Sequence, residues 1–458
     1  MASSAIAAFA RLVEARPPER AAIWFDTACV LGGSIAGLLA ARALADHARR
    51  VVVIERDEVN VDGRSRAGVP QDRQVHVLLP GGRRWLEHWL PGLTRDLQDR
   101  GAVLSGPGQF VQYTDGRPQV HEQPLLTASR PLLESRIRAR VLALPNVSAL
   151  QSQVTGLEYR DRRVTAVRYR ARGADRVLAA DLVVDAMGRA SRMAGWLEDD
   201  GYDVPPLQRL ATSINYASAL FKRTQPHVLS AAVAMFSPPY PVDGAAVAGI
   251  GAIENDQWIV LLMGYDDSHP GRRLEAFQDT CTKLPAGFAE ATRDAVTGKV
   301  YTYHQADSRR RDFDGQGRFP AGLLSVGDAV ASFNPIYAQG MSAAALHASC
   351  LAEYLRTEPV PGRPATTFFD LERIVVDAAW TLSAGGDAAR LDALTGAPVP
   401  DDISRQRWAL DQLLRAAPAD QAVARAVNDV TFMLAHPDIL ADPALLDRAV
   451  TANQQHPD

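Results

Sequence analysis

The sequence predicts an α/β fold with α+β character, in which a parallel-sheet domain is interleaved with an antiparallel-sheet domain and followed by a helical C-terminal part. Three observations predict this fold. A strand, a helix and a second strand follow one another early in the chain. Alternating β-rich stretches occupy its middle, and nearly every segment after residue 338 has helical spacing. With 458 residues, 47% of them hydrophobic, the chain can bury a large core.

The first unit is a strand–helix–strand arrangement around a glycine turn. Residues 27–31 and 51–54 are apolar runs typical of buried parallel strands, and residues 35–45 form an Ala- and Leu-rich helix. The turn reads "GGSIAG". In the dinucleotide fingerprint G-x-G-x-x-G, Gly32 makes the tight turn and Gly37 allows close packing of helix and strand. Ser34 stands where the fingerprint has its middle glycine. The unit is therefore Rossmann-like.

An acidic residue supports the same interpretation. Glu55 ends the second strand, eighteen residues after Gly37, where a carboxylate can accept hydrogen bonds from both ribose hydroxyls. The N-terminus of the helix supplies free N–H groups for a pyrophosphate. These features predict a bound dinucleotide without identifying it.

The remaining elements alternate along the chain. We expect a polar loop over 56–73, a helix over 82–90 and another from the serine of "ASRP". Residues 153–186 resemble a β-meander, and a second β-rich block covers 210–265. In that block, "AAVAGIGAI" and "QWIVLLMGY" form a predicted hairpin around the turn "END". A buried strand returns at 322–327.

The stretch "LLSVGDAVASFNPIYAQGMSAAALHA" identifies the dinucleotide. A strand ends at Gly327-Asp328, a loop with Pro335 follows, and a helix begins near Gly340-Met341-Ser342. Such an aspartate can accept from a ribityl hydroxyl, and the N–H groups at the helix start can face the carbonyls of a flavin. The segment "DLVVDAMGRASRMAGWL", with Asp185 and Gly188, lies between the two motifs and alone is also compatible with a capped turn.

Together these three segments resemble the flavoprotein monooxygenases of the p-hydroxybenzoate hydroxylase fold, with the motifs in the order of that family. "AGVPQDRQVH", "ASRPLLE", "GDAVASFNPIYAQGMSAA" and "DAAW" are similar to the polyether-type epoxidases of bacterial polyketide pathways. The resemblance runs from residue 27 to at least residue 380. FAD-dependent cyclases that form decalins are a second branch with this likeness.

The resemblance implies one FAD and a set of contacts. Gly32, Gly37 and Glu55 would hold the ADP half. The other expected cofactor-binding residues are Gly33, Ser34, Arg56, Arg66, Gln71, Arg130, Asp185, Gly188, Gly327, Asp328, Pro335, Gly340, Met341 and Ser342. Of these, Arg130 would lie beside the phosphates, Asp328 at the ribityl-pyrophosphate, and Gly340 with Met341 at the isoalloxazine. The chain departs from the branch at Gln74, where a histidine is more typical. The sequence identifies no catalytic residue.

The resemblance also suggests the domain organisation. We expect an N-terminal extension, either a short helix or disordered, over 1–26, and the first part of the FAD-binding domain, with inserted strands, over 27–200. A β-sheet substrate-binding domain would cover 201–305. The part of the FAD-binding domain with the Gly-Asp motif would cover 306–357, and a helical C-terminal region 358–458.

The expected function is that of an FAD-dependent monooxygenase, an epoxidase or hydroxylase of an apolar polyene polyketide in secondary metabolism. The middle sheet offers apolar side chains, and an alkene needs no acid–base pair. No second fingerprint is present, so NAD(P)H would bind transiently or a separate flavin reductase would supply electrons. No W-x-W-x-I-P signature is present, which excludes a halogenase. Two alternatives stay open: a cyclase that forms a decalin by [4+2] cycloaddition with non-redox FAD, and a prenyl-chain reductase.

Composition narrows the partners and the compartment. The net charge of −4 argues against nucleic acid, which basic patches bind. Three cysteines without metal-ligand spacing predict neither a disulfide framework nor a metal site. No apolar stretch reaches the roughly 18 residues that a membrane span needs. We therefore expect a cytoplasmic protein without a membrane span.

Overall fold

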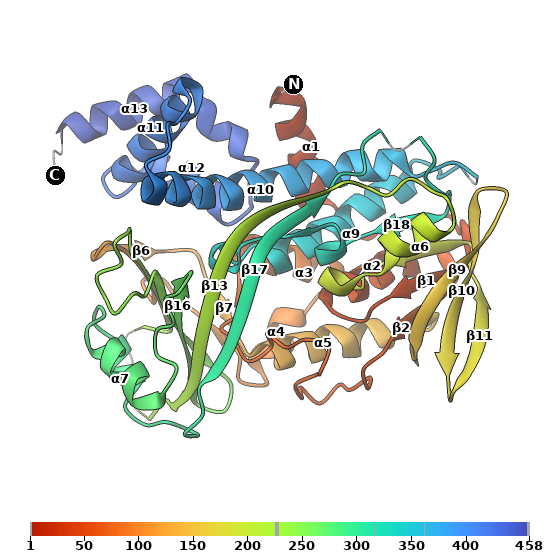
Figure 1. Cartoon of the computed structure of the whole chain (residues 1–458), viewed down its shortest axis with the longest axis horizontal. Coiled ribbons are helices and arrows are strands. Elements are labelled where there is room, and N and C mark those ends of the chain that lie inside the picture. Colours follow the sequence, from red (N-terminus) through yellow and green to blue (C-terminus); the bar gives the residue numbers. More distant parts are fainter. Residues whose placement is uncertain (1, 225–228, 316, 361, 456–458) are drawn as a thin grey trace.

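A parallel sheet organises the first half of the molecule (Figure 1). The computed structural model describes residues 2–224, 229–315, 317–360 and 362–455. Within these residues, five parallel strands lie in the order β18-β12-β1-β2-β8. Their bounds are Phe25–Leu31 (β1), Ala48–Glu55 (β2), Val147–Gln151 (β8), Leu182–Asp185 (β12) and Leu323–Ser325 (β18). Counted along the chain, this is the Rossmann order 3-2-1-4-5, whose switch point lies between β1 and β12.

Helices cover the faces of this sheet. They are α1 (Ala2–Glu14), α2 (Ile35–Ala45), α3 (Pro80–Trp89), α4 (Leu93–Gln98), α5 (Arg130–Leu142) and α9 (Gly340–Arg356). Helix α2 has the expected bounds and packs against α9. The N-terminal segment is a correction to the expected extension, because α1 buries Phe9 and Leu12 in the main core. Their apolar side chains attach this segment to the domain that follows it.

A second, larger sheet runs across the molecule. Its order among the described residues is β19-β17-β13-β16-β15-β14-β5-β6. The bounds are Phe110–Thr114 (β5), Arg117–His121 (β6), Leu207–Lys222 (β13), Ala231–Met235 (β14), Val247–Ile253 (β15), Gln257–Tyr265 (β16), Tyr301–Arg311 (β17) and Ala331–Ser332 (β19). The predicted hairpin is confirmed as β15–β16. The long strands β13 and β17 are the paired ribbons that cross the middle of Figure 1.

This sheet does not respect the expected domain boundaries. Strands β5 and β6 come from residues 110–121, within the segment assigned to the FAD-binding domain, and β5 pairs in parallel with β14. The boundary expected between residues 305 and 306 lies inside β17. Strand pairing between distant segments sets both features, and periodicity within a segment cannot reveal it.

Two small sheets and several short helices complete the first 330 residues. The expected meander is confirmed in part: β9 (Gln153–Arg160), β10 (Arg163–Ala171) and β11 (Ala174–Ala179) are antiparallel, whereas β12 joins the parallel sheet. The other small sheet has the order β3-β7-β4. The short elements are β3 (Val77–Leu78), β4 (Val103–Leu104), β7 (Leu126–Thr127), α6 (Met193–Asp199), α7 (Leu274–Thr282), α8 (Phe288–Ala291) and the 3-10 turns η1 (Gly188–Ala190) and η2 (Gly327–Ala329).

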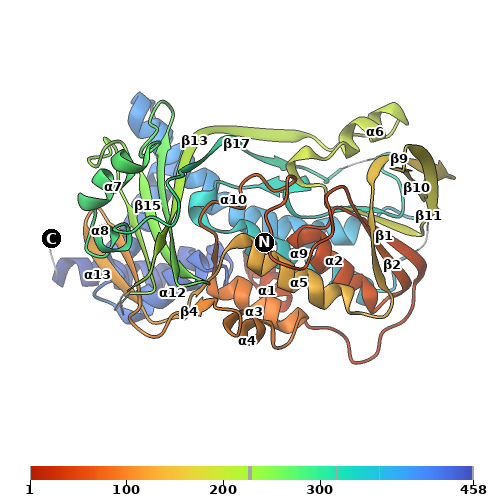
Figure 2. The same cartoon turned by 90° about the horizontal axis from the view of Figure 1, so that it is seen from below.

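The last part of the chain is helical, as expected. After the 3-10 turn η3 (Pro335–Tyr337) and α9 come α10 (Thr366–Thr395), α11 (Asp401–Ala416), α12 (Gln421–Thr431), η4 (Pro437–Ala441) and α13 (Pro443–Gln455). Figures 1 and 2 both show α12 and α13 beside the end of the larger sheet that carries β15 and β16. The expected mixed α/β fold is confirmed. Over the described part of the chain, no helix is both long and apolar enough to cross a bilayer.

Candidate cofactor and substrate site

One large cavity opens at the switch point of the parallel sheet. Its volume is about 2000 Å³, and its wall draws on the carboxyl ends of the parallel strands, on the larger sheet and on the C-terminal helices. Ligand pockets usually measure roughly 300–1,000 Å³. The cavity therefore has room for a dinucleotide and a second molecule.

The glycine turn after β1 lies at one end of this cavity. Gly32 has a φ of +108°, and a Cβ there would approach the carbonyl oxygen of Ala186 to 2.4 Å. A Cβ on Gly37 would approach the carbonyl oxygen of Gly32 to 2.0 Å. Only glycine allows β1, α2 and β12 to meet this closely.

Helix α2 begins at this turn without a side-chain cap. Its N-cap residue, Ser34, accepts no hydrogen bond from the first helical N–H groups described here. Instead, the hydroxyl of Ser34 accepts from Nη2 of Arg66 at 2.8 Å. The N–H groups at the start of α2 are therefore available to an anionic ligand.

Glu55 lies where the fingerprint requires its acid. At the end of β2, its carboxylate accepts from the N–H of Gly33 at 2.7 Å and from the N–H of Asp57 at 3.0 Å. Arg66 forms an ion pair with it at 3.2 Å. A carboxylate has about four lone-pair positions. Glu55 also lines the cavity, so it has capacity left for a ribose hydroxyl.

Glu134 is a functional candidate that the sequence reasoning missed. This carboxylate on α5 forms ion pairs with Arg66, Arg130 and Arg138. Burial opposes its ionisation, but the three guanidinium groups outweigh burial and lower the pKa of Glu134 to about 2. Arg66 and Arg130 line the cavity next to Ser34, so Glu134 holds two cations where a pyrophosphate would lie. The i, i+4 spacing of Arg130, Glu134 and Arg138 was the available signal.

The Gly-Asp motif forms the tight turn η2 against α2. Gly327 has a φ of +64°, and a Cβ on it would lie 2.5 Å from the Cβ of Ala36. Its N–H donates to Nδ1 of His347 at 2.9 Å. The next residue, Asp328, lines the cavity. Burial raises the pKa of Asp328, although Arg189 and Arg130 nearby oppose the shift.

The start of α9 is a second uncapped helix N-terminus. The N-cap residue Gln339 gives the described N–H groups no side-chain bond, and its own buried Oε1 has no partner among the described residues. No described heavy atom lies within 4 Å of the position that a Cβ on Gly340 would take. Gly340 and Met341 line the cavity. Free N–H groups at this end are suited to the carbonyl oxygens of a flavin ring.

The cavity wall includes most of the residues expected from the sequence. They are Gly32, Ser34, Glu55, Arg56, Arg66, Gln71, Arg130, Gly188, Gly327, Asp328, Pro335, Gly340 and Met341. Four expected residues are not among the described residues of the wall: Gly33, Gly37, Asp185 and Ser342.

The positions of Asp185 and Ser342 are corrections. The buried carboxylate of Asp185 accepts from the hydroxyl of Ser191 at 2.5 Å and from the N–H of Met187 at 3.0 Å, so it braces the turn that presents Gly188. Burial raises the pKa of Asp185 to about 6. Ser342 faces α3 instead, where a Cβ on Gly82 would lie 2.5 Å from its hydroxyl.

Polar groups are sparse where the cavity reaches the larger sheet. Gln74 is held in place, because its Oε1 accepts from Ser218 at 2.7 Å and its amide donates to the carbonyl of Tyr301 at 3.2 Å. His76, two residues later, also lines the cavity, and burial lowers the pKa of His76 to about 4. The hydroxyl of Tyr216 is buried without a partner in the described structure. Burial raises the pKa of Tyr216 well above its usual value.

The rest of this wall is apolar. Val247 and Gly249 of β15 and Leu261 and Met263 of β16 line it. The two strands are hydrogen-bonded neighbours, and these residues alternate along each, so they share the face of the sheet that looks into the cavity.

The two uncapped helices, the paired arginines and the carboxylates at two strand ends together fit FAD. They supply donors for a pyrophosphate, acceptors for ribose and ribityl hydroxyls, and donors for ring carbonyls. Three of these groups come from segments more than 100 residues apart in the chain.

Comparison with known proteins agrees with this fit. A family model described as FAD binding domain matches residues 26–358. Protein Rv3254 of Mycobacterium tuberculosis is 33% identical over 420 residues, which cover 87% of this chain and 88% of that protein.

Solved structures share the fold. The flavin-dependent brominase Bmp2 matches with a TM-score of 0.65 and 16% identity, covering 94% of this chain and 99% of that chain. The p-nitrophenol 4-monooxygenase PnpA from Pseudomonas putida matches with a TM-score of 0.60 and 19% identity, covering 93% of this chain and 99% of that chain. The chain is thus an FAD-binding protein and belongs to the FAD binding domain family.

Proposed function

We propose that this protein is an FAD-dependent monooxygenase that epoxidises or hydroxylates an apolar polyketide, of the polyene type, in secondary metabolism. One observation carries the proposal: a single cavity joins the expected flavin-binding residues to the apolar face of β15 and β16. A substrate in contact with that face would lie beside the ring end of the cofactor. The fold shared with PnpA and similar enzymes supports an oxygenase.

The chain's own residues would bind, orient and exclude water. Glu55 and the start of α2 would hold the ADP half, Asp328 the ribityl chain, and the start of α9 the flavin ring. Bound FAD, once reduced, supplies the chemistry that activates oxygen. Val247, Leu261 and Met263 would keep the reacting face dry, which protects reactive species from water.

The titratable groups favour an alkene over a phenol. Hydroxylation of a phenol gains from a base that ionises its hydroxyl. His76 is a weak base, because burial lowers its pKa to about 4, and burial keeps Tyr216 protonated. An alkene needs neither group.

A halogenase is disfavoured by the same wall. That chemistry would need a catalytic lysine in the cavity, and none of the described wall residues is a lysine. Lys283 is instead paired at the surface with Asp243 and Asp279.

Electrons would come from NAD(P)H bound transiently or from a separate flavin reductase. The test uses purified, FAD-loaded protein with a panel of linear polyenes, NADPH or a reductase, and isotopically labelled dioxygen. We expect a yellow protein that releases FAD on denaturation, and a product that carries one labelled oxygen atom, detected by mass spectrometry. A product of unchanged mass, formed equally well without oxygen or reductant, would overturn the monooxygenase and favour the [4+2] cyclase.

A further inference from the structure

The C-terminal helices form the outer wall of the cavity. Ile403, Arg407, Leu410 and Leu414 of α11 line it together with Val427 and Val430 of α12. These residues lie within the last 60 residues of the chain, beyond the part that matches the FAD binding domain family. The C-terminal region therefore shapes the cavity although it supplies none of the expected flavin contacts.

Helix α11 has two apolar faces with different surroundings. Leu413 and Ala416 are buried in the core of the C-terminal helices. Ile403, Leu410 and Leu414, spaced i, i+7 and i+11, lie on another face, which is turned to the cavity. Leu410 is 39% exposed and Leu414 is 52% exposed, so no described side chain covers this second face.

The helix is nevertheless fixed in place. Arg407 of α11 forms an ion pair at 2.6 Å with Asp392 of α10. At the end of α12, Phe432 contacts the ring of His121 edge-on at 5.6 Å, and His121 stacks on Phe110 at 4.7 Å. These contacts connect the C-terminal helices to β5 and β6.

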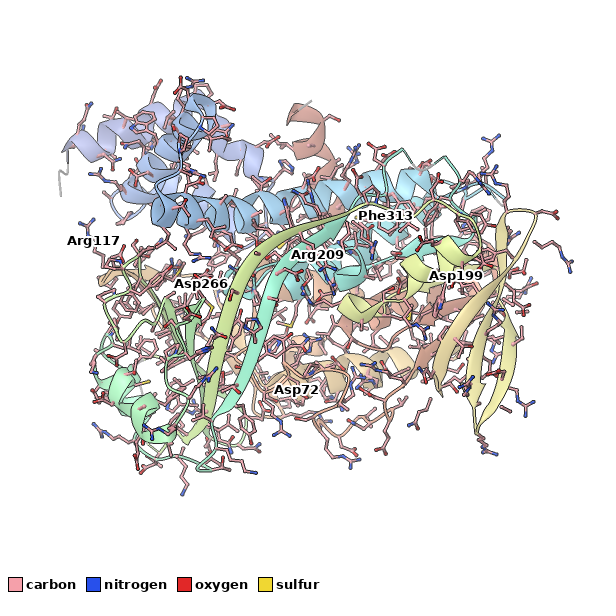
Figure 3. The ribbon with its side chains drawn as sticks, viewed as in Figure 1. Asp72, Arg117, Asp199, Arg209, Asp266 and Phe313 are labelled. Carbon is pink, nitrogen blue, oxygen red and sulfur yellow. The ribbon has the colours of Figure 1, made fainter. Side chains whose placement is uncertain are left out.

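Opposite α11, the cavity is closed by the edge of the larger sheet. Phe110 of β5 and Ala231 and Val233 of β14 line it there. Arg117 at the start of β6 also belongs to the wall, and Figure 3 shows it at the outer edge of the molecule, next to the C-terminal helices. We call the space between Leu410 and Leu414 on one side and Phe110 and Val233 on the other the distal chamber.

We propose that the distal chamber binds the apolar chain of an elongated substrate and that Leu410 and Leu414 set the chain length accepted. This inference rests on the proposed function for the position of the reacting group, which would lie at the flavin end of the same cavity. The chamber is continuous with the cofactor site, so a molecule bound at the flavin can extend into it. A second copy of the chain would meet α11 from outside, where Trp408 lies, and not from within the cavity.

The experiment measures chain-length dependence with FAD-loaded protein. The fluorescent polyene cis-parinaric acid is bound first and then displaced by straight-chain primary alcohols of increasing length. We expect affinity to rise about fourfold for each methylene buried, up to a limiting length. Leu410→Trp combined with Leu414→Trp should fill the chamber and shorten that limit by several methylenes.

Two further variants keep the test decisive. Trp408→Ala is the matched control, because Trp408 is a 52% exposed apolar residue on the same helix that is not a described part of the wall. It should leave the limiting length unchanged. Should the tryptophan variant fail to fold, Leu410→Ala with Leu414→Ala should weaken the longest alcohols by about tenfold and leave the shortest unchanged.

Three results would overturn the proposal: an unchanged limiting length in the leucine variants, an equal change in Trp408→Ala, or a leucine variant that dissociates a dimer in light scattering. The last result would assign this face of α11 to a second copy. Because displacement needs no turnover, length selection without oxygen incorporation would leave the distal chamber standing while the monooxygenase fails.

Discussion

Two carboxylates at strand ends, Glu55 and Asp328, are the residues on which flavin affinity should depend most. Glu55→Ala should weaken FAD binding by about 1–3 kcal/mol, the scale for lost hydrogen bonds to a charged group. Asp328→Ala should do at least as much. Asp199→Ala is the control, because Asp199 is exposed on α6, at the opposite end of the molecule from the distal chamber (Figure 3). Fluorescence titration of apoprotein with FAD measures all three, and unchanged affinity in both site variants would contradict the assignment.

Glu134 should matter for stability as well as for the site. Glu134→Gln leaves three buried guanidinium groups without their carboxylate, which should lower the free energy of unfolding by about 3–5 kcal/mol. The pKa of Glu134 is lowered to about 2 from 4.5. Its contribution is therefore full above pH 4.5 and is lost as the pH falls towards 2.

Urea denaturation at several pH values measures this contribution. Asp99→Asn breaks an i, i+4 pair with Arg95 of the same kind, but on the surface, and should change stability by less than about 0.5 kcal/mol. Equal losses in the two variants would show that burial of the Glu134 cluster is unimportant.

At the scale of elements, the approach of α2 to the parallel sheet depends on a missing side chain. Gly37→Ala would put a Cβ 2.0 Å from the carbonyl oxygen of Gly32, so α2 must move away from the turn that it helps to form. We expect loss of FAD binding and a destabilisation of about 1–3 kcal/mol. Gly195→Ala, on α6, meets no described atom within 4 Å and should stabilise the protein by up to about 1 kcal/mol. Flavin content and thermal unfolding distinguish the two.

Helices α9 and α10 are joined behind the Gly-Asp turn by a buried pair, His347 and Glu372, whose side chains are 3.1 Å apart. Burial raises the pKa of Glu372 well above 4.5, so its contribution to stability is full below pH 4.5 and is lost as the pH rises through the folded value. Burial lowers the pKa of His347 to about 3, so its contribution is full above pH 6.5 and is lost as the pH falls towards 3.

Glu372→Gln therefore should raise the melting temperature at pH 8, because the amide is neutral at every pH. It should also flatten the alkaline side of the stability profile. Glu353→Gln, a change on the partly exposed side chain that pairs with Arg356, is the control and should do neither. A variant at Glu372 that is less stable than the parent at pH 8 would contradict the neutral buried carboxyl.

At the scale of the whole molecule, FAD should stabilise the fold because its site draws on both sheets. Adding FAD at 100 times its dissociation constant should raise the free energy of unfolding by about 2.7 kcal/mol over the apoprotein. Riboflavin lacks the ADP half and cannot reach Glu55 or the start of α2, so it should stabilise much less at the same concentration. Calorimetry of apoprotein with each ligand checks this, and equal shifts would contradict the placement of the ADP half.

The sequence by itself determined the parts of the protein that are local in the chain. The bounds of α2 follow from residues within one helix, and the glycine turn is required by the φ of Gly32 and the close approach at Gly37. The order of the motifs was enough to predict FAD and the Rossmann-like arrangement. Spacing also contained the Arg130–Glu134–Arg138 series, which was missed although it needed no tertiary information.

Only the tertiary structure decided what depends on contacts between distant segments. The inward turn of Asp185, the crossing of the expected boundary by β17 and the insertion of β5 into the larger sheet follow from pairing and packing, which no local pattern records. The distal chamber is the clearest case, because its walls are more than 280 residues apart in the chain. An apolar helix face reads the same in a sequence whether it is buried in a core or faces a cavity, and only the fold distinguishes them.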